Sequence, residues 1–118
     1  VDLVDTYTTD IFSTIEGSLG YTVDGIKLVN GMRVLFPAEK DIRQKGKIFK
    51  VSFITHKGRR QISLLEETDS TPINNETVLV LNGVVNKGKM FYYNGSEWQT
   101  TQEKTKVNQQ PLFDLFDE

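Results

Sequence analysis

Apolar and polar residues alternate through the middle of the chain, as they do in β-strands that bury one face. The run 47–54 is the longest example, and its two faces carry Phe49, Val51 and Phe53 on one side and Lys50 and Ser52 on the other. A shorter run, 61–65, follows the turn signal Lys57-Gly58. The pattern therefore predicts that the two runs pair as an antiparallel hairpin.

Two further strands and a loop are predicted around this hairpin. Residues 33–36 form a short apolar run that Pro37 ends. Residues 78–81, Val-Leu-Val-Leu, show no alternation, which predicts a central strand covered on both faces. The stretch 66–77 is polar and contains proline and asparagine, so it is expected to be a surface loop.

Glycine marks the turns. Four of the nine glycines follow Asp or Asn, at Asp24-Gly25, Asn30-Gly31, Asn82-Gly83 and Asn94-Gly95. These pairs tolerate the positive φ angles that tight hairpin turns require. Two short hairpins are therefore predicted, one with arms 21–23 and 26–28 and one with arms 91–93 and 97–99.

One helix is predicted, near the N-terminus. Thr8, Thr9 or Asp10 can cap it, and its apolar face would consist of Ile11, Phe12, Ile15 and Leu19. Gly17 and Gly20 are expected to end it.

Composition supports a mainly β fold. Valine, isoleucine and threonine supply 31 of the 118 residues, whereas alanine occurs once. We expect a small antiparallel barrel or sandwich of short strands with one N-terminal helix. Residues 1–106 are predicted to form a single β-rich domain, and residues 107–118 an apolar tail that leads to a neighbouring domain or subunit.

Charge and cysteine content exclude several classes of protein. The net charge of −2 argues against a strongly basic nucleic-acid binder, although Lys57, Arg59 and Arg60 cluster at one hairpin end. The chain has no cysteine, so disulfides and thiolate chemistry are excluded. It also lacks a run of about 18 apolar residues. We therefore expect neither a nucleic-acid partner nor a membrane span.

Catalytic chemistry has little support. The single histidine, His56, falls in a predicted turn, and one histidine without cysteine cannot build the usual zinc site. The carboxylates form two clusters without calcium-loop spacing, Glu66, Glu67 and Asp69, then Asp114, Asp117 and Glu118. A hydrolase built on paired carboxylates stays open, because such pairs meet only in space. We expect no enzymatic activity, no cofactor and no metal.

Three segments carry a resemblance to a known module: Val-Asp-Gly-Ile-Lys-Leu at 23–28, Asn-Gly-Met-Arg-Val-Leu-Phe at 30–36, and Lys-Ile-Phe-Lys-Val at 47–51. Together they resemble a module common in virion proteins of tailed bacteriophages, in which a DGV-x-L hairpin precedes x-G-D-R-V-L-V and N-G-I-Y-x-V. Residues 88–98 and 106–117 look like segments of very large structural proteins of such phages.

The resemblance implies a structural, non-enzymatic module of a phage tail, baseplate or fibre protein, located in the virion. Its partners would be other domains of the same long chain and neighbouring virion subunits. Such modules are internal, and the chain begins at Val1 without a methionine, so we expect an excised segment of a longer protein.

Two sets of residues are candidates for binding. The tail residues Leu112, Phe113, Leu115 and Phe116 would form one apolar face if helical, and they are the predicted interaction residues. The aromatic set Tyr92, Tyr93 and Trp98, with Asn94, could instead hold a host-surface glycan. Alternation along the strand favours cross-strand packing over a ligand platform for that set.

Overall fold

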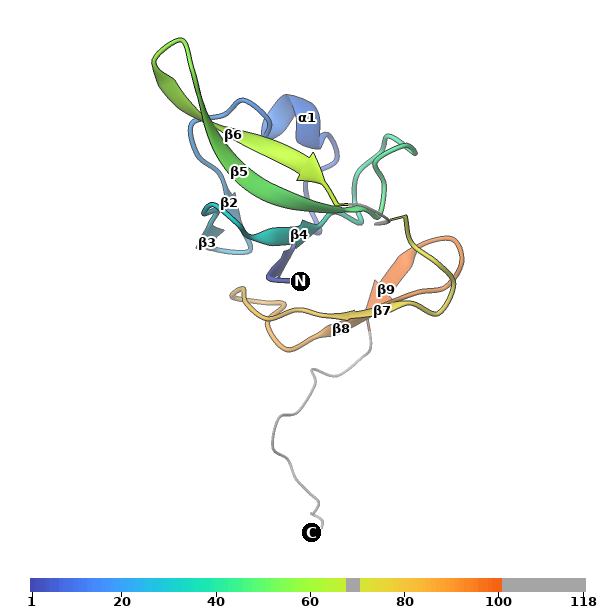
Figure 1. Cartoon of the computed structure of the whole chain (residues 1–118). Coiled ribbons are helices and arrows are strands. Elements are labelled where there is room, and N and C mark those ends of the chain that lie inside the picture. The colour runs from blue at the N-terminus through green and yellow to red at the C-terminus, as the bar shows by residue number, and fades with distance from the viewer. Residues whose placement is uncertain (68–70, 101–118) are drawn as a thin grey trace, which may run out of the picture.

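The structure, a computed structural model, describes residues 1–67 and 71–100 of the chain and confirms the mainly β class (Figure 1). In chain order its elements are β1 (Leu3–Val4), α1 (Ile11–Thr14), β2 (Thr22–Val23), β3 (Ile26–Lys27), β4 (Arg33–Leu35), β5 (Ile48–His56), β6 (Arg59–Glu66), β7 (Thr77–Leu79), β8 (Met90–Tyr93) and β9 (Trp98–Thr100). The strands form three small sheets.

The central sheet has four strands in the order β1-β4-β5-β6. Strand β1 runs parallel to β4, and the other neighbours are antiparallel. The predicted pairing of β5 with β6 is confirmed, with Phe49 opposite Glu66 at one end and His56 opposite Arg59 at the other. This hairpin turns at Lys57 and Gly58, both at positive φ, and its tip extends beyond the rest of the molecule (Figure 1).

One face of the central sheet is covered by α1 and by the two-stranded sheet β2–β3. The buried residues on this side form one cluster, namely Leu3, Val34, Phe36, Phe49, Val51, Ile62 and Leu64 from the central sheet and the residue after β4, with Ile11, Ile15, Val23 and Leu28 from the covering segments. The expectation that Phe49 and Val51 share an apolar face is thereby confirmed.

The opposite face is covered by the three-stranded sheet β7-β8-β9, at the end of β5 that begins with Ile48. A second cluster joins Val4, Leu35 and Ile48 to Val80, Phe91 and Trp98. The central sheet therefore has a separate apolar core on each side, and α1 and β9 lie against opposite faces.

The first two residues join the central sheet to β7. The amino group of Val1 donates to the carbonyl of Leu79, and the N–H of Leu81 donates to the carbonyl of Val1, at 3.0 Å in both cases. The N–H of Asp2 donates to the carbonyl of Arg33 on β4 at 2.9 Å. Over the described residues, the sheets nevertheless do not close into a barrel.

The helix is shorter than its apolar spacing predicts. It starts at Asp10, one of the three candidate caps, but contains a single turn, and Leu19 is exposed. Gly17 follows the helix at positive φ, and its N–H donates to the carbonyl of Ile62 on β6, at 2.8 Å. Binding to the edge of β6 thus replaces further helical turns.

The prediction of a two-faced buried strand at residues 78–81 is wrong. Val80 is 1% exposed, whereas Leu81 is 58% exposed, so the side chains alternate. The backbone of this segment does have hydrogen-bond partners on both edges. The N–H of Val80 donates to the carbonyl of Lys89, and the N–H of Leu81 donates to the carbonyl of Val1. Only one of its faces packs against another sheet, which is why alternate side chains remain in solvent.

The two predicted glycine hairpins are confirmed as β2–β3 and β8–β9. Within residues 1–67 and 71–100, no helix is long and apolar enough to cross a membrane. The boundary expected after residue 106 lies outside the described residues, as do the predicted interaction residues Leu112, Phe113, Leu115 and Phe116.

Candidate functional site

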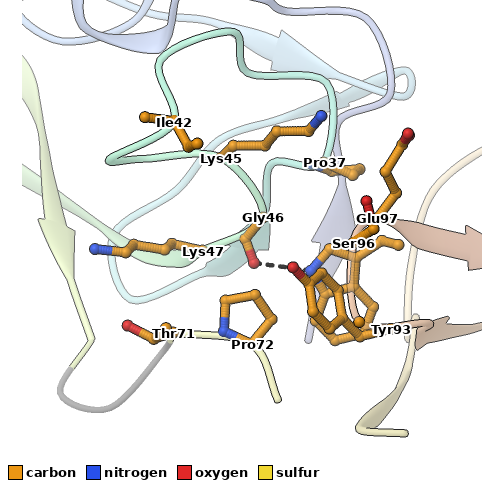
Figure 2. Close-up of a pocket in the computed structure, with 12 residues that line it drawn as sticks. Pro37, Ile42, Lys45, Gly46, Lys47, Thr71, Pro72, Tyr93, Ser96 and Glu97 are labelled. Atoms are coloured by element: carbon orange, nitrogen blue, oxygen red, sulfur yellow. Dashed lines mark hydrogen bonds between the residues drawn. The ribbon is translucent and has the colours of Figure 1, made fainter. Parts of the chain in front are cut away.

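A depression with a volume of about 400 Å³ lies beside the β8–β9 hairpin. Three segments surround it: the loop between β4 and β5, residues Thr71 and Pro72, and the hairpin itself (Figure 2). Two of the four predicted glycan-binding residues, Tyr93 and Trp98, line it. We call it the Trp98 depression.

Trp98 lines this depression and is mostly buried. Its side chain is 9% exposed, and its Nε1 donates a hydrogen bond of 2.8 Å to the carbonyl of Gly46. Tyr93 lies opposite Trp98 in the strand pairing, and the two rings are 5.5 Å apart at 58°. The Trp98 ring therefore packs between Tyr93 and the β4–β5 loop and offers little open surface for stacking a sugar.

Gly46 allows the loop to approach the indole this closely. Its φ is +76°, in the left-handed region that favours glycine. A β-carbon built there would lie 3.0 Å from the Nε1 of Trp98 and 3.1 Å from its Cδ1. Any larger residue at position 46 would therefore push against the ring.

The other two glycan candidates do not line the Trp98 depression. Tyr92 points to the opposite face of β8, and its hydroxyl donates to the Oε1 of Gln99 at 3.0 Å. The Oδ1 of Asn94 accepts from the backbone N–H groups of Ser96 and Glu97, at 2.9 and 2.8 Å. Asn94 therefore shapes the hairpin turn, and the structure splits the predicted set of four into two pairs.

Charged residues also border the Trp98 depression. Lys45, Lys47 and Glu97 line it. The Nζ of Lys47 forms an ion pair with Glu66 at 3.0 Å, so much of its charge is balanced. Lys45 and Glu97 place one positive and one negative group beside the aromatic pair, an arrangement suited to polar ligands.

The structure places some of the residues that were considered for catalysis or metal binding. His56 ends β5, opposite Arg59, and is exposed. Across residues 1–67 and 71–100, no group of three or more histidine or acidic side chains is placed to hold a metal ion. Asp69, Asp114, Asp117 and Glu118 lie outside the described residues.

The carboxylates Glu66 and Glu67 take part in ion pairs. Arg33 donates two hydrogen bonds to Glu67, at 2.7 and 3.0 Å. These bonds are the main reason why the pKa of Glu67 is lowered and that of Arg33 is raised from their ordinary values. Glu66 thus balances Lys47, in the loop before β5, and Glu67 balances Arg33 of β4, so both carboxylates connect separate segments of the fold.

Two buried carboxylates, those of Asp5 and Glu39, were not predicted from the sequence. Asp5 accepts hydrogen bonds from the N–H groups of Tyr7 and Thr8, each at 2.9 Å. Glu39 accepts from the N–H of Ile11, at 2.7 Å, and thereby satisfies a donor at the start of α1. The Asp5-x-x-Thr8 spacing is a local signal that could have identified the first, but the partner of Glu39 is 28 residues away.

The structure also assigns a long-range role to Asp24. Its two carboxylate oxygens accept from the N–H groups of Val85 and Asn86, at 3.0 and 2.9 Å. Its carbonyl accepts from Val84 at 3.0 Å, and Gly83 lies so close that a β-carbon there would collide with the Asp24 side chain. Asp24 therefore both makes the β2–β3 turn and binds the loop that follows β7.

Comparisons with protein-family models, with curated proteins and with solved structures find no match to this chain.

Proposed function

We propose that the chain is a non-enzymatic structural module of a tailed-phage virion protein, in a tail, baseplate or fibre. The observation that carries this proposal is the role of Asp24, the most chemically capable residue of the resembling segments. Both of its oxygens accept from backbone N–H groups more than 60 positions away in the chain, so the carboxylate attaches one part of the fold to another. The motif that suggests the family is thus used to hold the fold together.

Other residues of the resembling segments have similar roles. The N–H of Gly31, at positive φ, donates to the carbonyl of Val51 at 2.7 Å. Val34 and Leu35 are fully buried on opposite faces of β4, one in each core. A segment whose residues specify turns and cores suits a scaffold, whose task is to keep its loops and edges at fixed positions.

The mechanism in this proposal is mechanical. The N-terminal residues and Asp24 connect the three-stranded sheet to the rest of the molecule, so that both cores unfold or persist together. The β5–β6 hairpin projects from this rigid body, and the tail residues Leu112, Phe113, Leu115 and Phe116 would provide the contact with a neighbour.

Immunogold labelling of phage particles tests the proposal. Antibodies against this domain should label the tail or its tip in electron micrographs of particles from phage lysates. Label on free antigen in the lysate, with particles consistently unlabelled, would refute a structural role in the virion. Antibodies preabsorbed with the purified domain serve as the control for specificity.

A second candidate is a glycan-binding module that would recognise a host surface; the observation in its favour is half-buried Tyr93, which lies with charged groups at the Trp98 depression. Tyr93 and Trp98 lie beside Lys45 and Glu97 there, and Trp98 is the sole tryptophan of the chain. Binding of a glycan should therefore change tryptophan emission, and Tyr93→Ala should abolish the change. Tyr92→Phe, on the opposite face, should leave it intact. Unchanged emission across a glycan panel would reject this candidate.

A further inference from the structure

A second depression, with a volume of about 290 Å³, lies on the side of the central sheet that carries α1 and β2–β3. Its walls are the segment after α1, the end of β3 with the residues that follow it, and the β5–β6 hairpin. Phe53 lies in it, so we call it the Phe53 groove.

The Phe53 groove combines exposed apolar surface with positive charge. Leu19 and Val29, which line it, are 60% and 50% exposed. Lys27 and Arg60 are its charged residues, and the guanidinium carbon of Arg60 lies 4.5 Å from the centre of the Phe53 ring. Within residues 1–67 and 71–100, the ion pairs involve other cations, so the charges of Lys27 and Arg60 are not balanced.

The same sign of charge continues along the hairpin. Lys57 and Arg59 at the tip are likewise absent from the ion pairs of the described residues. A ligand that fits this surface needs large apolar side chains for the groove and acidic groups for the cations around it. A glycan or a nucleic-acid base would satisfy only part of that requirement.

The chain itself contains a segment with that chemistry. Residues 111–118 read Pro-Leu-Phe-Asp-Leu-Phe-Asp-Glu, with four large apolar side chains interspersed with three acidic ones. This segment follows Thr100, the last residue of β9, after ten intervening residues, which span roughly 35 Å when extended. Its acidic residues match the unbalanced cations of the groove.

The position of β9 indicates which copy supplies the segment. Trp98 of β9 packs against one face of the central sheet, whereas Phe53 packs on the other. A tail that returned to the groove of its own chain would have to pass around the edge of that sheet. We propose that the Phe53 groove binds residues 111–118 of a second copy of this chain.

The inference rests on the proposed assembly function and names its partner. A groove on one copy that takes the tail of another is a head-to-tail contact, which grows into rings or filaments. Its failure is distinguishable from failure of the proposed function. Particle labelling does not depend on this contact, and head-to-tail association in solution does not depend on virion location.

Sedimentation velocity of the full chain tests the contact with two variants. The tail variant carries Phe113→Ser and Phe116→Ser, and the groove variant carries Lys27→Glu and Arg60→Glu. The wild type should associate with increasing concentration, and less so at high salt. Each variant alone should associate at least roughly tenfold more weakly, because the first loses the apolar side chains and the second places like charges against the tail.

An equimolar mixture of the two variants gives the decisive result. The tail variant retains an intact groove and the groove variant an intact tail, so the mixture should form dimers and nothing larger. The control is Lys45→Glu with Lys87→Glu, which changes the net charge equally but leaves the groove intact, and it should associate like the wild type. Circular dichroism and Trp98 emission verify that every variant is folded.

Three results would overturn the proposal. The wild type could remain monomeric up to about 1 mM, a concentration at which even weak contacts form. The mixture could fail to dimerise although the wild type associates. The Lys45 and Lys87 control could abolish association while the groove variant does not, which would place the tail at the Trp98 depression instead.

Discussion

Replacement of Asp24 tests how the two cores are connected. This residue is half-buried and its backbone has a φ of +49°. Its carboxylate accepts from the N–H groups of Val85 and Asn86. Three substitutions separate its contributions. Asp24→Ala removes both acceptors and tolerates positive φ poorly, Asp24→Gly removes the acceptors but accepts that φ, and Asp24→Asn keeps one acceptor oxygen and tolerates it.

The magnitudes follow from the two hydrogen bonds. A bond to a charged acceptor contributes about 1.5–3 kcal/mol, and the lower value applies here because Val85 is exposed to water. Loss of both bonds should therefore lower the free energy of unfolding by about 3 kcal/mol in Asp24→Gly. Asp24→Ala adds about 1 kcal/mol of backbone strain, and Asp24→Asn should lose about 1.5 kcal/mol.

Urea unfolding followed by Trp98 fluorescence is the suitable assay, because Trp98 belongs to the core that Asp24 helps to attach. Asp24→Ala should lose the most stability, Asp24→Gly less, and Asp24→Asn the least. The reasoning would be refuted by an Asp24→Ala variant that loses less than about 1 kcal/mol. An Asp24→Gly variant more stable than the wild type would also refute it, because backbone strain would then outweigh the hydrogen bonds.

Two further predictions concern the Trp98 depression and the edge of the central sheet. Gly46→Ala should lose about 1–3 kcal/mol more than Gly58→Ala in thermal unfolding, because both glycines have positive φ but only the first has a ring, that of Trp98, against its added β-carbon. Arg33 lowers the pKa of Glu67, so the stability from this pair is complete above the ordinary value of 4.5 and is lost as the pH falls through the lower folded pKa. Because the pair is partly exposed, it contributes less than about 1 kcal/mol to the free energy of unfolding. Glu67→Gln should therefore flatten the dependence of stability on pH over that acidic range. An unchanged dependence would contradict the assignment.

Local conformational preference made several elements predictable. Asp24-Gly25 adopts positive φ at both residues and Lys57-Gly58 does the same, so these turns form where the sequence predicts them. Alternation within β5 correctly assigned Phe49 and Val51 to one face. In each case the determining interaction lies within a few residues of the position itself.

The length of α1 was not predictable in this way. The apolar spacing continues to Leu19, but the N–H of Gly17 bonds Ile62 and a carboxylate oxygen of Glu16 accepts from Leu64. Both partners are on β6, more than 40 positions away in the chain. A neighbouring strand edge thus outweighs helix continuation, and no local pattern contains that information.

The candidate site was predictable only where its contacts are local. The aromatic residues of β8 and β9 were recognisable, and their pairing followed from the hairpin. The role of Asn94 is also local, because its partners Ser96 and Glu97 belong to the predicted Asn94-Gly95 turn. The bond from Trp98 to the carbonyl of Gly46 joins positions 52 residues apart, and no local pattern contains it.

Local patterns in the sequence were sufficient to predict the mainly β class, the glycine hairpins and the apolar face of β5, because backbone preference and period-two burial act over short distances. Which faces are covered, where α1 ends and what Asp24 binds depend instead on contacts between distant segments. These outcomes depend on backbone groups that seek partners across the whole fold, since a buried N–H or carbonyl must be satisfied by whichever segment reaches it.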